Sequence, residues 1–112
     1  MALVAFDTTM GSRYTGSVTR EIEFDWDRWN VQKNEVKHGV SRLEAESAFH
    51  DPHYLLFQDL IHSTPREARY LLYGRSLENR VLTVGFTLRG VRVRVITARS
   101  ASRKERRIYE EE

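Results

Sequence analysis

The second half of the chain is rich in arginine. Residues 66–108 hold 12 of the 18 lysines and arginines against three acids, a net charge of +9, and 15 of the 18 cations are arginines. A guanidinium group is planar and always charged, so it binds phosphate or carboxylate groups through two parallel hydrogen bonds. The residue types therefore favour a partner or substrate that carries phosphate or other acidic groups.

One histidine lies where it could transfer a proton. His38 follows Lys37 and precedes Gly39, at the predicted end of a helix. An imidazole with a pKa near about 6.5 can accept or donate a proton at neutral pH, and a lysine beside it could stabilise negative charge. The same two residues are also favoured in the last turn of a helix, because cations interact well with the helix dipole there. Both interpretations stay open.

Other chemistries find little support in the sequence. His50 and His53 are three residues apart, but Pro52 breaks the helix between them and no third ligand is evident. The sequence contains no cysteine, no serine, histidine and aspartate arrangement with local support, and no glycine-rich phosphate loop. We therefore expect neither a metal site nor another cofactor.

The length of the chain sets its domain organisation. A chain of 112 residues has room for one core and can fold without disulfides or a structural zinc ion. Residues 1–20 show no hydrophobic period and include an internal Met10, so we interpret them as an extension that is native, a tag or upstream of an alternative start. Residues 21–112 are predicted to form a single domain. No membrane-spanning run or signal peptide is predicted, and we expect a cytoplasmic protein.

A short strand and a helix are predicted first. Apolar residues alternate with acids over 22–26, as in a strand with one buried face. Asp27 can cap a helix that stops at Gly39, the residue type that most readily takes the left-handed conformation after a helix. The apolar stripe of this helix is predicted to be Trp29, Gln32 or Lys33, and Val36, with Trp26 and Trp29 as core anchors.

A second helix is predicted to begin directly afterwards. Ser41 and Glu44 have the spacing of a capping box, in which each side chain binds the backbone amide of the other residue. Asp51-Pro52 ends this helix, because a proline disfavours the helical conformation of the residue before it. Its buried face is predicted to contain Leu43, Ala48 and Phe49.

Strands dominate the rest of the chain. Four segments are rich in β-branched and aromatic residues: 53–58, 69–73, 81–88 and 91–98. In the last of them Val91, Val93 and Val95 alternate with Arg92 and Arg94, which predicts a sheet with one packed face and one wet face. A hairpin is predicted at Arg89-Gly90, and a capping box of Ser102 and Glu105 opens a final helix over 103–111. The elements predict an α+β fold in which an N-terminal strand and two helices pack on an antiparallel sheet of about four strands, followed by a C-terminal helix.

Several separated motifs, in this order, resemble the BrnT toxin family. The motifs are the helix end at 33–41, the capped helix with Glu44 and Ala45, Gly74-Arg75-Ser76, the strand 94–99 and the helix 103–110. The resemblance covers about residues 22–110. It implies a RelE-like ribonuclease fold, a role as the toxin of a bacterial type II toxin–antitoxin pair, and neutralisation by a BrnA antitoxin with a ribbon-helix-helix domain.

The resemblance suggests which residues cut RNA. Arg75 matches the family's Gly-Arg pair and is expected to hold the scissile phosphate, although a solvated arginine at a turn is the alternative. Arg99 closes the last strand where the final helix begins, and is expected to bind phosphate or to form a salt bridge with an acid such as Glu105. His38 and Lys37, in a motif similar to the family's, complete the predicted catalytic set.

Three further residues are predicted to bind RNA. Arg92 and Arg94 are expected to contact phosphates or the antitoxin rather than to act in catalysis. Tyr109 is expected to stack on a base or donate a proton, with a packed aromatic residue as the alternative. Glu44 could orient His38 or Lys37, or serve only as the helix cap.

The function implied is a metal-independent endoribonuclease that inhibits translation by RNA cleavage through attack of the 2′-hydroxyl. Its expected partners are RNA and a BrnA-like antitoxin, with a heterotetramer as one assembly, and no membrane. An alternative is a non-catalytic nucleic-acid-binding or complex-forming module whose arginines dock a partner. A third interpretation is a small phosphodiesterase that acts on another phosphorylated substrate.

Overall fold

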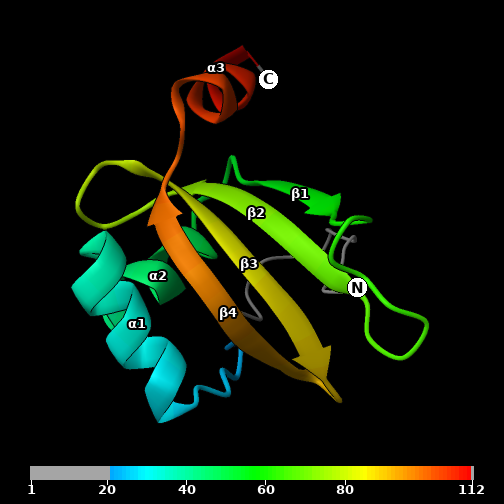
Figure 1. The fold of residues 1–112 in the computed structure, drawn as a ribbon. Helices are drawn as coiled ribbons and strands as arrows, with labels where there is room; N and C mark the ends of the chain where they lie inside the picture. Colours follow the sequence, from blue (N-terminus) through cyan, green and yellow to red (C-terminus); the bar gives the residue numbers. More distant parts are fainter. Residues whose placement is uncertain (1–20, 112) are drawn as a thin grey trace.

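A four-stranded antiparallel sheet forms the centre of the molecule (Figure 1). In the computed structural model, which describes residues 21–111, the strands are β1 (Leu55–Gln58), β2 (Arg69–Arg75), β3 (Val81–Arg89) and β4 (Arg92–Ser100), and each pairs with the next along the chain. The helices of this part are α1 (Arg28–His38), α2 (Arg42–Ala48) and α3 (Arg103–Glu111). The predicted α+β class is confirmed, whereas the predicted extension over 1–20 lies outside the described residues.

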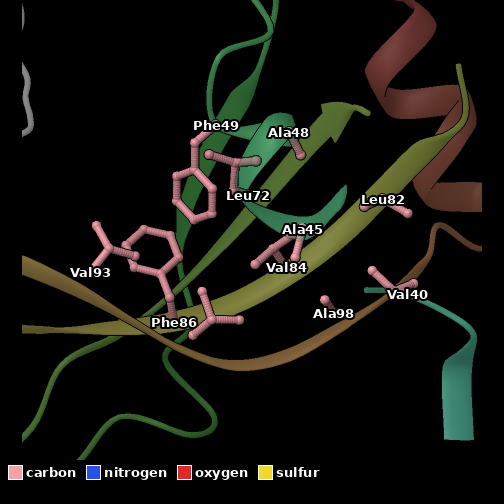
Figure 2. Close-up of a cluster of buried hydrophobic side chains, with 11 residues drawn as sticks. Val40, Ala45, Ala48, Phe49, Leu72, Leu82, Val84, Phe86, Val93 and Ala98 are labelled. Atoms are coloured by element: carbon pink, nitrogen blue, oxygen red, sulfur yellow. The ribbon is translucent and has the colours of Figure 1, made fainter. Parts of the chain in front are cut away.

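Helix α2 lies over one face of the sheet with the hydrophobic core between it and the strands (Figure 2), and α1 packs beside it along β4. The ring of Phe49, at the end of α2, meets Phe24 and Phe86 edge to face, with ring centroids 5.2 Å apart in both pairs. Such aromatic pairs add to the stabilisation that comes from burying their area. The core cluster is Val40, Ala45, Ala48, Phe49, Leu72, Leu82, Val84, Phe86, Val93, Val95 and Ala98.

Helix α1 packs on the sheet through polar residues, so its predicted apolar stripe is wrong. Trp29 is 71% exposed and Val36 is 88% exposed, whereas Asn30 and Asn34 are buried. Asn30 donates to the Val95 carbonyl, and Asn34 accepts from the Ala98 amide at 3.2 Å. These contacts satisfy backbone groups on the outer edge of β4, which has no further strand beside it at these residues. The need of that edge for hydrogen bonds, rather than hydrophobicity, decides which side of α1 faces inward.

Residues 22–26 do not form a regular strand. Phe24 makes an isolated parallel bridge with Val93, in which the Asp25 amide donates to the Val93 carbonyl at 2.8 Å and the Val93 amide donates to Glu23 at 2.9 Å. The alternation that suggested a strand is nevertheless real, because Ile22, Phe24 and Trp26 are partly buried against the core. The segment thus packs as a strand would but pairs at one point only.

The predicted helix caps are confirmed with one exception. Asp27 accepts from the Asn30 amide, Gly39 takes the left-handed conformation at φ 66°, and Ser41 accepts from the Glu44 amide. Ser102 and Glu105 form the full reciprocal capping box. The carboxylate of Glu44, however, binds Ser76 and Arg80 instead of the backbone, so this part of the first capping box is wrong.

The strands match the predicted segments with shifted ends. Strand β1 begins two residues later than predicted, and β2 and β4 run two residues further. Val91 is 86% exposed in the hairpin turn, so it does not share the packed face of Val93 and Val95. A bulge opposite Gly85 and Phe86 shifts the register of β4, after which Ala98 rather than Thr97 faces the core.

The other face of the sheet carries the residues that matter for the site. Tyr73, Thr83 and Arg99 lie side by side across β2, β3 and β4. Their side chains point away from α1 and α2, because the neighbouring Leu72, Leu82 and Ala98 face the core and successive side chains of a strand alternate. Helix α3 packs at this end of the outer face.

Candidate active site

Helix α3 contacts both arginines that were expected to bind the scissile phosphate. Glu105 and Tyr109 are four residues apart and therefore lie on one side of the helix. Glu105 reaches Arg99, and Tyr109 lies under the guanidinium of Arg75. Arg75 follows Tyr73 by two residues on β2, so both arginines lie on the outer face at the same end of the sheet.

Arg99 is engaged by a carboxylate of the protein itself. Its Nη1 and Nη2 donate to the two oxygens of Glu105 at 2.8 and 2.9 Å, and the Thr83 hydroxyl donates to the same carboxylate at 2.8 Å. The hydrogen bonds from Arg99 are the main reason why the pKa of Glu105 falls to about 2. The predicted salt bridge is thus present. A phosphate at Arg99 has to join or replace this carboxylate.

Arg75 retains a free charge. No carboxylate among residues 21–111 pairs with its guanidinium, which lies 5.6 Å from the ring centroid of Tyr109 and 3.4 Å from the carbonyl and side-chain oxygens of Asn79. A guanidinium over an aromatic face gains a favourable electrostatic contact, and the long bonds to Asn79 engage only Nη1, so the other donors of Arg75 can bind a further acceptor. Of the two arginines, Arg75 is therefore the one ready to bind a phosphate.

Asp51 joins Arg75 to Tyr109, and sequence reasoning missed it. The Tyr109 hydroxyl and the Arg75 amide both donate to Oδ2 of Asp51, at 2.5 and 2.7 Å, and the His53 amide donates to Oδ1 at 2.9 Å. Burial raises the pKa of Asp51, but these hydrogen bonds outweigh it and hold the pKa below its ordinary value. Asp51 is consequently ionised at neutral pH.

Tyr109 stays protonated in this arrangement. Burial, followed by the hydrogen bond to Asp51 and its negative charge, raises the pKa of Tyr109 above its ordinary value. A phenol that keeps its proton can donate a hydrogen bond or a proton but cannot act as a base. The side chain is partly exposed, so its ring is also available for stacking.

The glycine before Arg75 has a packing role. A Cβ atom at Gly74 would lie 2.4 Å from the Ala48 carbonyl oxygen, so no other residue fits between the end of α2 and β2 without a backbone shift. The glycine thereby lets α2 approach the strand whose next residue is Arg75. The Gly-Arg motif thus combines a residue needed for packing with a residue free for chemistry.

His38 and Lys37 lie at the end of α1. Burial, followed by the charges of Lys37, Lys33 and Arg99, lowers the pKa of His38 from its ordinary value. Gly39, which follows His38, accepts from Arg80, and the same guanidinium reaches Ser100 at the end of β4, so His38 lies near the end of the sheet that holds Arg99. A neutral imidazole at pH 7 can accept a proton. Lys37 is exposed to solvent.

An ion pair between the buried carboxylate of Glu44 and the partly exposed Arg80 connects the residues beside His38 and Arg99. Arg80 donates from Nε and Nη2 to the carboxylate of Glu44, each at 2.7 Å. The same guanidinium donates to the Gly39 carbonyl at 2.8 Å and to the Ser100 hydroxyl at 3.2 Å. In the described part of the chain, no hydrogen bond joins Glu44 to His38 or Lys37, which it was predicted to orient. Glu44 instead binds Arg80, which donates to the Gly39 carbonyl at the end of α1.

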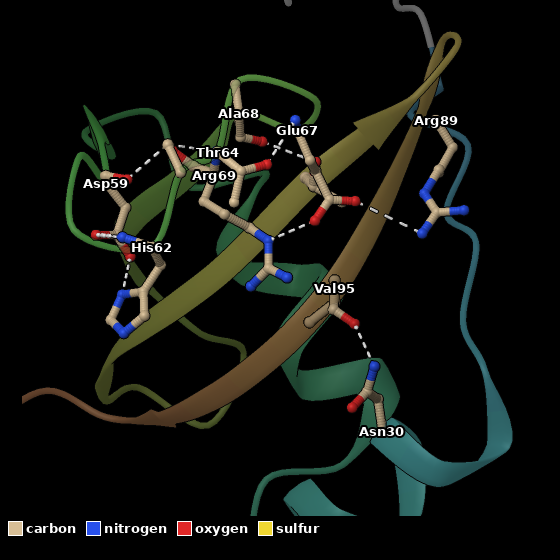
Figure 3. A network of polar contacts seen from close by, with 11 residues as sticks. Asn30, Asp59, His62, Thr64, Glu67, Ala68, Arg69, Arg89 and Val95 are labelled. Carbon is tan, nitrogen blue, oxygen red and sulfur yellow. Dashed lines mark hydrogen bonds and ion pairs between the residues drawn. The ribbon is translucent and has the colours of Figure 1, made fainter.

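Arg92 and Arg94 lie at the opposite end of β4, away from the other candidates. Arg92 pairs with Glu23 at 3.3 Å, and Arg94 pairs with Asp25 and Asp27 at 3.1 and 2.9 Å. Both arginines therefore anchor the segment before α1. Further ion pairs at this end join Glu67 to Arg69 and Arg89, as Figure 3 shows.

Two depressions of the surface lie away from the candidate catalytic residues. A depression of about 340 Å³ lies at the hairpin end beside Tyr70 and Thr87, and one of about 500 Å³ lies between the segment before α1 and α2. Within residues 21–111, no three His, Asp or Glu side chains gather as ligands of a metal ion. Neither of these two depressions is lined by a candidate catalytic residue.

The fold and the site define a small α+β protein with a basic and aromatic face suited to phosphate-bearing ligands. Residues 26–105 match the family model of the ribonuclease toxin, BrnT, of type II toxin–antitoxin systems, and the chain belongs to this family. Its structure is similar to the crystal structure of the ribonuclease toxin BrnT of Brucella abortus, with a TM-score of 0.54 and 24% sequence identity over 74% of this chain and 100% of that chain. No curated protein matches the sequence.

No helix in the described part of the chain is long and apolar enough to cross a membrane. The expected cytoplasmic location and the division at residue 20 stay predictions.

Proposed function

We propose that the protein is a metal-independent endoribonuclease toxin that cleaves RNA through attack of the 2′-hydroxyl. The family supports a ribonuclease toxin. The observation that carries the finer proposal is that Arg75 and Arg99 share the outer face at one end of the sheet, both in contact with α3. Cations placed together can stabilise the extra negative charge of a pentacoordinate phosphorus.

Each candidate has a role that fits its environment. Arg75, whose charge no carboxylate balances, holds the scissile phosphate. His38, neutral at pH 7 because of its lowered pKa, accepts the proton of the 2′-hydroxyl, and Lys37 stabilises negative charge beside it. Arg99 adds positive charge at the phosphate once RNA competes with Glu105. Tyr109 stacks on a base or donates a proton to the leaving 5′-oxygen.

These roles need no metal ion, because side chains supply the base, the acid and the positive charge. Cleavage by the purified protein should therefore proceed unchanged in EDTA. Loss of activity in EDTA that Mg²⁺ restores would contradict this part of the proposal.

The partners follow from the family. A toxin of a type II system is paired with an antitoxin, which we propose is a BrnA-like ribbon-helix-helix protein that neutralises this toxin in a heterotetramer. Inhibition of translation, and a RelE-like relationship of the fold, belong to the same proposal.

The decisive experiment compares arginines from the two ends of the molecule. An Arg75→Ala/Arg99→Ala variant and an Arg75→Ala variant are assayed for RNA cleavage and, without antitoxin, for growth arrest. Arg89→Ala is the matched control, because Arg89 is an exposed arginine at the hairpin end. We expect strong loss of cleavage in the first two variants and full activity in the control.

Several outcomes would count against the proposal. Equal growth arrest from the wild type and both site variants would contradict the site. RNA that is retarded on a gel, with a steep salt dependence but unchanged length, would favour the non-catalytic binding module. Cleavage of phosphorylated substrates other than RNA would favour a phosphodiesterase.

A further inference from the structure

Asp51 receives hydrogen bonds from two candidate residues that are distant in the sequence. It lies between α2 and β1 and is 9% exposed. One oxygen, Oδ2, accepts from the Tyr109 hydroxyl of α3 and from the Arg75 amide of β2. An ionised carboxylate only accepts hydrogen bonds, so it can hold two donors on one atom without conflict.

We propose that Asp51 is a positioning residue for the ribonuclease reaction, an inference that rests on the proposed function. Its carboxylate fixes the ring of Tyr109 and the backbone of Arg75 relative to one another. The guanidinium of Arg75 is thereby held over the ring, where its donors face the phosphate of a bound RNA. Displacement of a charged group by about 1 Å can lower a reaction rate by about 100-fold, so this fixation matters for the rate.

The placement of α3 makes the role of Asp51 specific. No residue of α3 is fully buried, and the hydrogen bonds of Glu105 and Tyr109 tie the helix to the sheet. The contact of Glu105 fixes the start of the helix, and that of Asp51 fixes its last turns. By contrast the carboxylate of Glu44, which binds Ser76 and Arg80, accepts no hydrogen bond from Arg75, Arg99 or Tyr109 in the described part of the chain.

The test replaces the carboxylate without changing its size. In Asp51→Asn, the negative charge is lost and one of the two oxygens becomes an NH₂ group, so either the Tyr109 hydroxyl and the Arg75 amide or the His53 amide lose their acceptor, and the contact with Tyr109 is at least weakened. We expect kcat for RNA cleavage to fall by about 10- to 100-fold, with a smaller change in KM. Tyr109→Phe should lower kcat similarly. The double variant should be no slower than the slower single variant, because both changes remove one shared contact.

A second readout follows the contact without using activity. NMR of ¹³C-labelled tyrosine rings gives the pKa of Tyr109, whose signal is assigned by its loss in Tyr109→Phe. Asp51 raises this pKa, so Asp51→Asn should lower it towards 10. Glu67→Gln is the matched control, because it replaces a carboxylate that pairs with Arg69 and Arg89 at the other end of the sheet. It should change neither kcat nor the Tyr109 titration.

The outcomes separate this inference from the function on which it rests. A folded Asp51→Asn protein with unchanged kcat, or effects of the two variants that multiply, would overturn the positioning role. If the wild type cleaves no RNA while Asp51→Asn still lowers the pKa of Tyr109, the contact exists but the proposed function is wrong. If Asp51→Asn does not fold, Tyr109→Phe decides, because it leaves the bonds from Asp51 to the two backbone amides in place, and unchanged kcat there would overturn the role.

Discussion

At the scale of single residues, charge balance distinguishes the arginines better than their position in a motif. Arg92 and Arg94 are bound by acids of the segment before α1, and Arg99 is bound by Glu105. Arg75 alone among the predicted arginines has a guanidinium without a carboxylate partner in the described residues. A charge that is already balanced gains less from a phosphate, so Arg75 should contribute most to substrate binding.

The pH dependence of cleavage should report His38. Since burial and three neighbouring cations lower its pKa, the neutral form persists below the ordinary value of 6.5. If His38 is the base, the rate should rise with pH through a midpoint below 6.5 and then level off. A pH profile of kcat/KM for the wild type and His38→Gln checks this.

The variant should lose that rise and retain little activity. A profile of the same shape in His38→Gln would show that the histidine is only part of the helix end. Circular dichroism of the variant serves as the control for folding.

At the scale of elements, the residues that cap a helix were easier to predict than the side of the helix that faces the core. Asp27, Gly39 and Ser41 act within one or two helical turns, and such local contacts are visible in a sequence. The side of α1 that faces inward depends instead on the free edge of β4, which is more than 60 residues away in the chain. Only the structure brings that edge beside the helix.

Because α1 buries polar residues and exposes Trp29, loss of a buried asparagine should destabilise the protein more than loss of the tryptophan. Asn34→Ala removes the acceptor of the buried Ala98 amide and should lower the free energy of unfolding by about 1–3 kcal/mol. We expect this loss although Nδ2 of Asn34 has no hydrogen-bond partner among the described residues. Trp29→Ala, on the exposed side, should change it by about 0.5 kcal/mol or less. Urea unfolding of the two variants measures both effects. A larger loss from Trp29→Ala would contradict the observed orientation of α1.

The candidate site divides in the same way between local and distant contacts. Arg75, Arg99, His38 and Tyr109 were predicted from motifs, and the salt bridge from Arg99 to Glu105 was one of two interpretations. Asp51 was missed because the pair Asp51-Pro52 has an adequate local explanation as the end of a helix. Its contact with Tyr109 joins residues 58 positions apart, and no local pattern signals it.

At the scale of the whole molecule, helix α3 carries a group of cations without carboxylate partners among the described residues. The hairpin end holds Arg69, Arg89, Arg92 and Arg94, all in ion pairs. Helix α3 carries four exposed cations that form no ion pair within residues 21–111: Arg103, Lys104, Arg106 and Arg107. Glu110 and Glu111 follow in its last turn, so the positive charge is concentrated near the start of the helix.

This distribution predicts where RNA binding depends on salt. Neutralising Arg103 and Arg107 to Gln should weaken binding to RNA of any sequence and reduce the slope of log K against log salt concentration by about 0.7 per cation. Arg92→Gln should leave the slope unchanged, because Glu23 already balances that charge. Titrations of each protein with RNA at salt concentrations from about 50 to about 200 mM test both variants. Equal slopes in all proteins would place the RNA elsewhere.

The lack of any core residue in α3 has a consequence for the cell. A nonsense mutation before Arg103, or trimming by a carboxypeptidase, would remove Glu105 and Tyr109 without removing any residue of the core cluster. It would also remove the acceptor of the Thr83 hydroxyl, which is 1% exposed on the outer face. We expect the shortened chain to keep its core while Arg75 and Arg99 lose their contacts with α3, so truncation is a route by which the toxin gene can lose activity separately from its core.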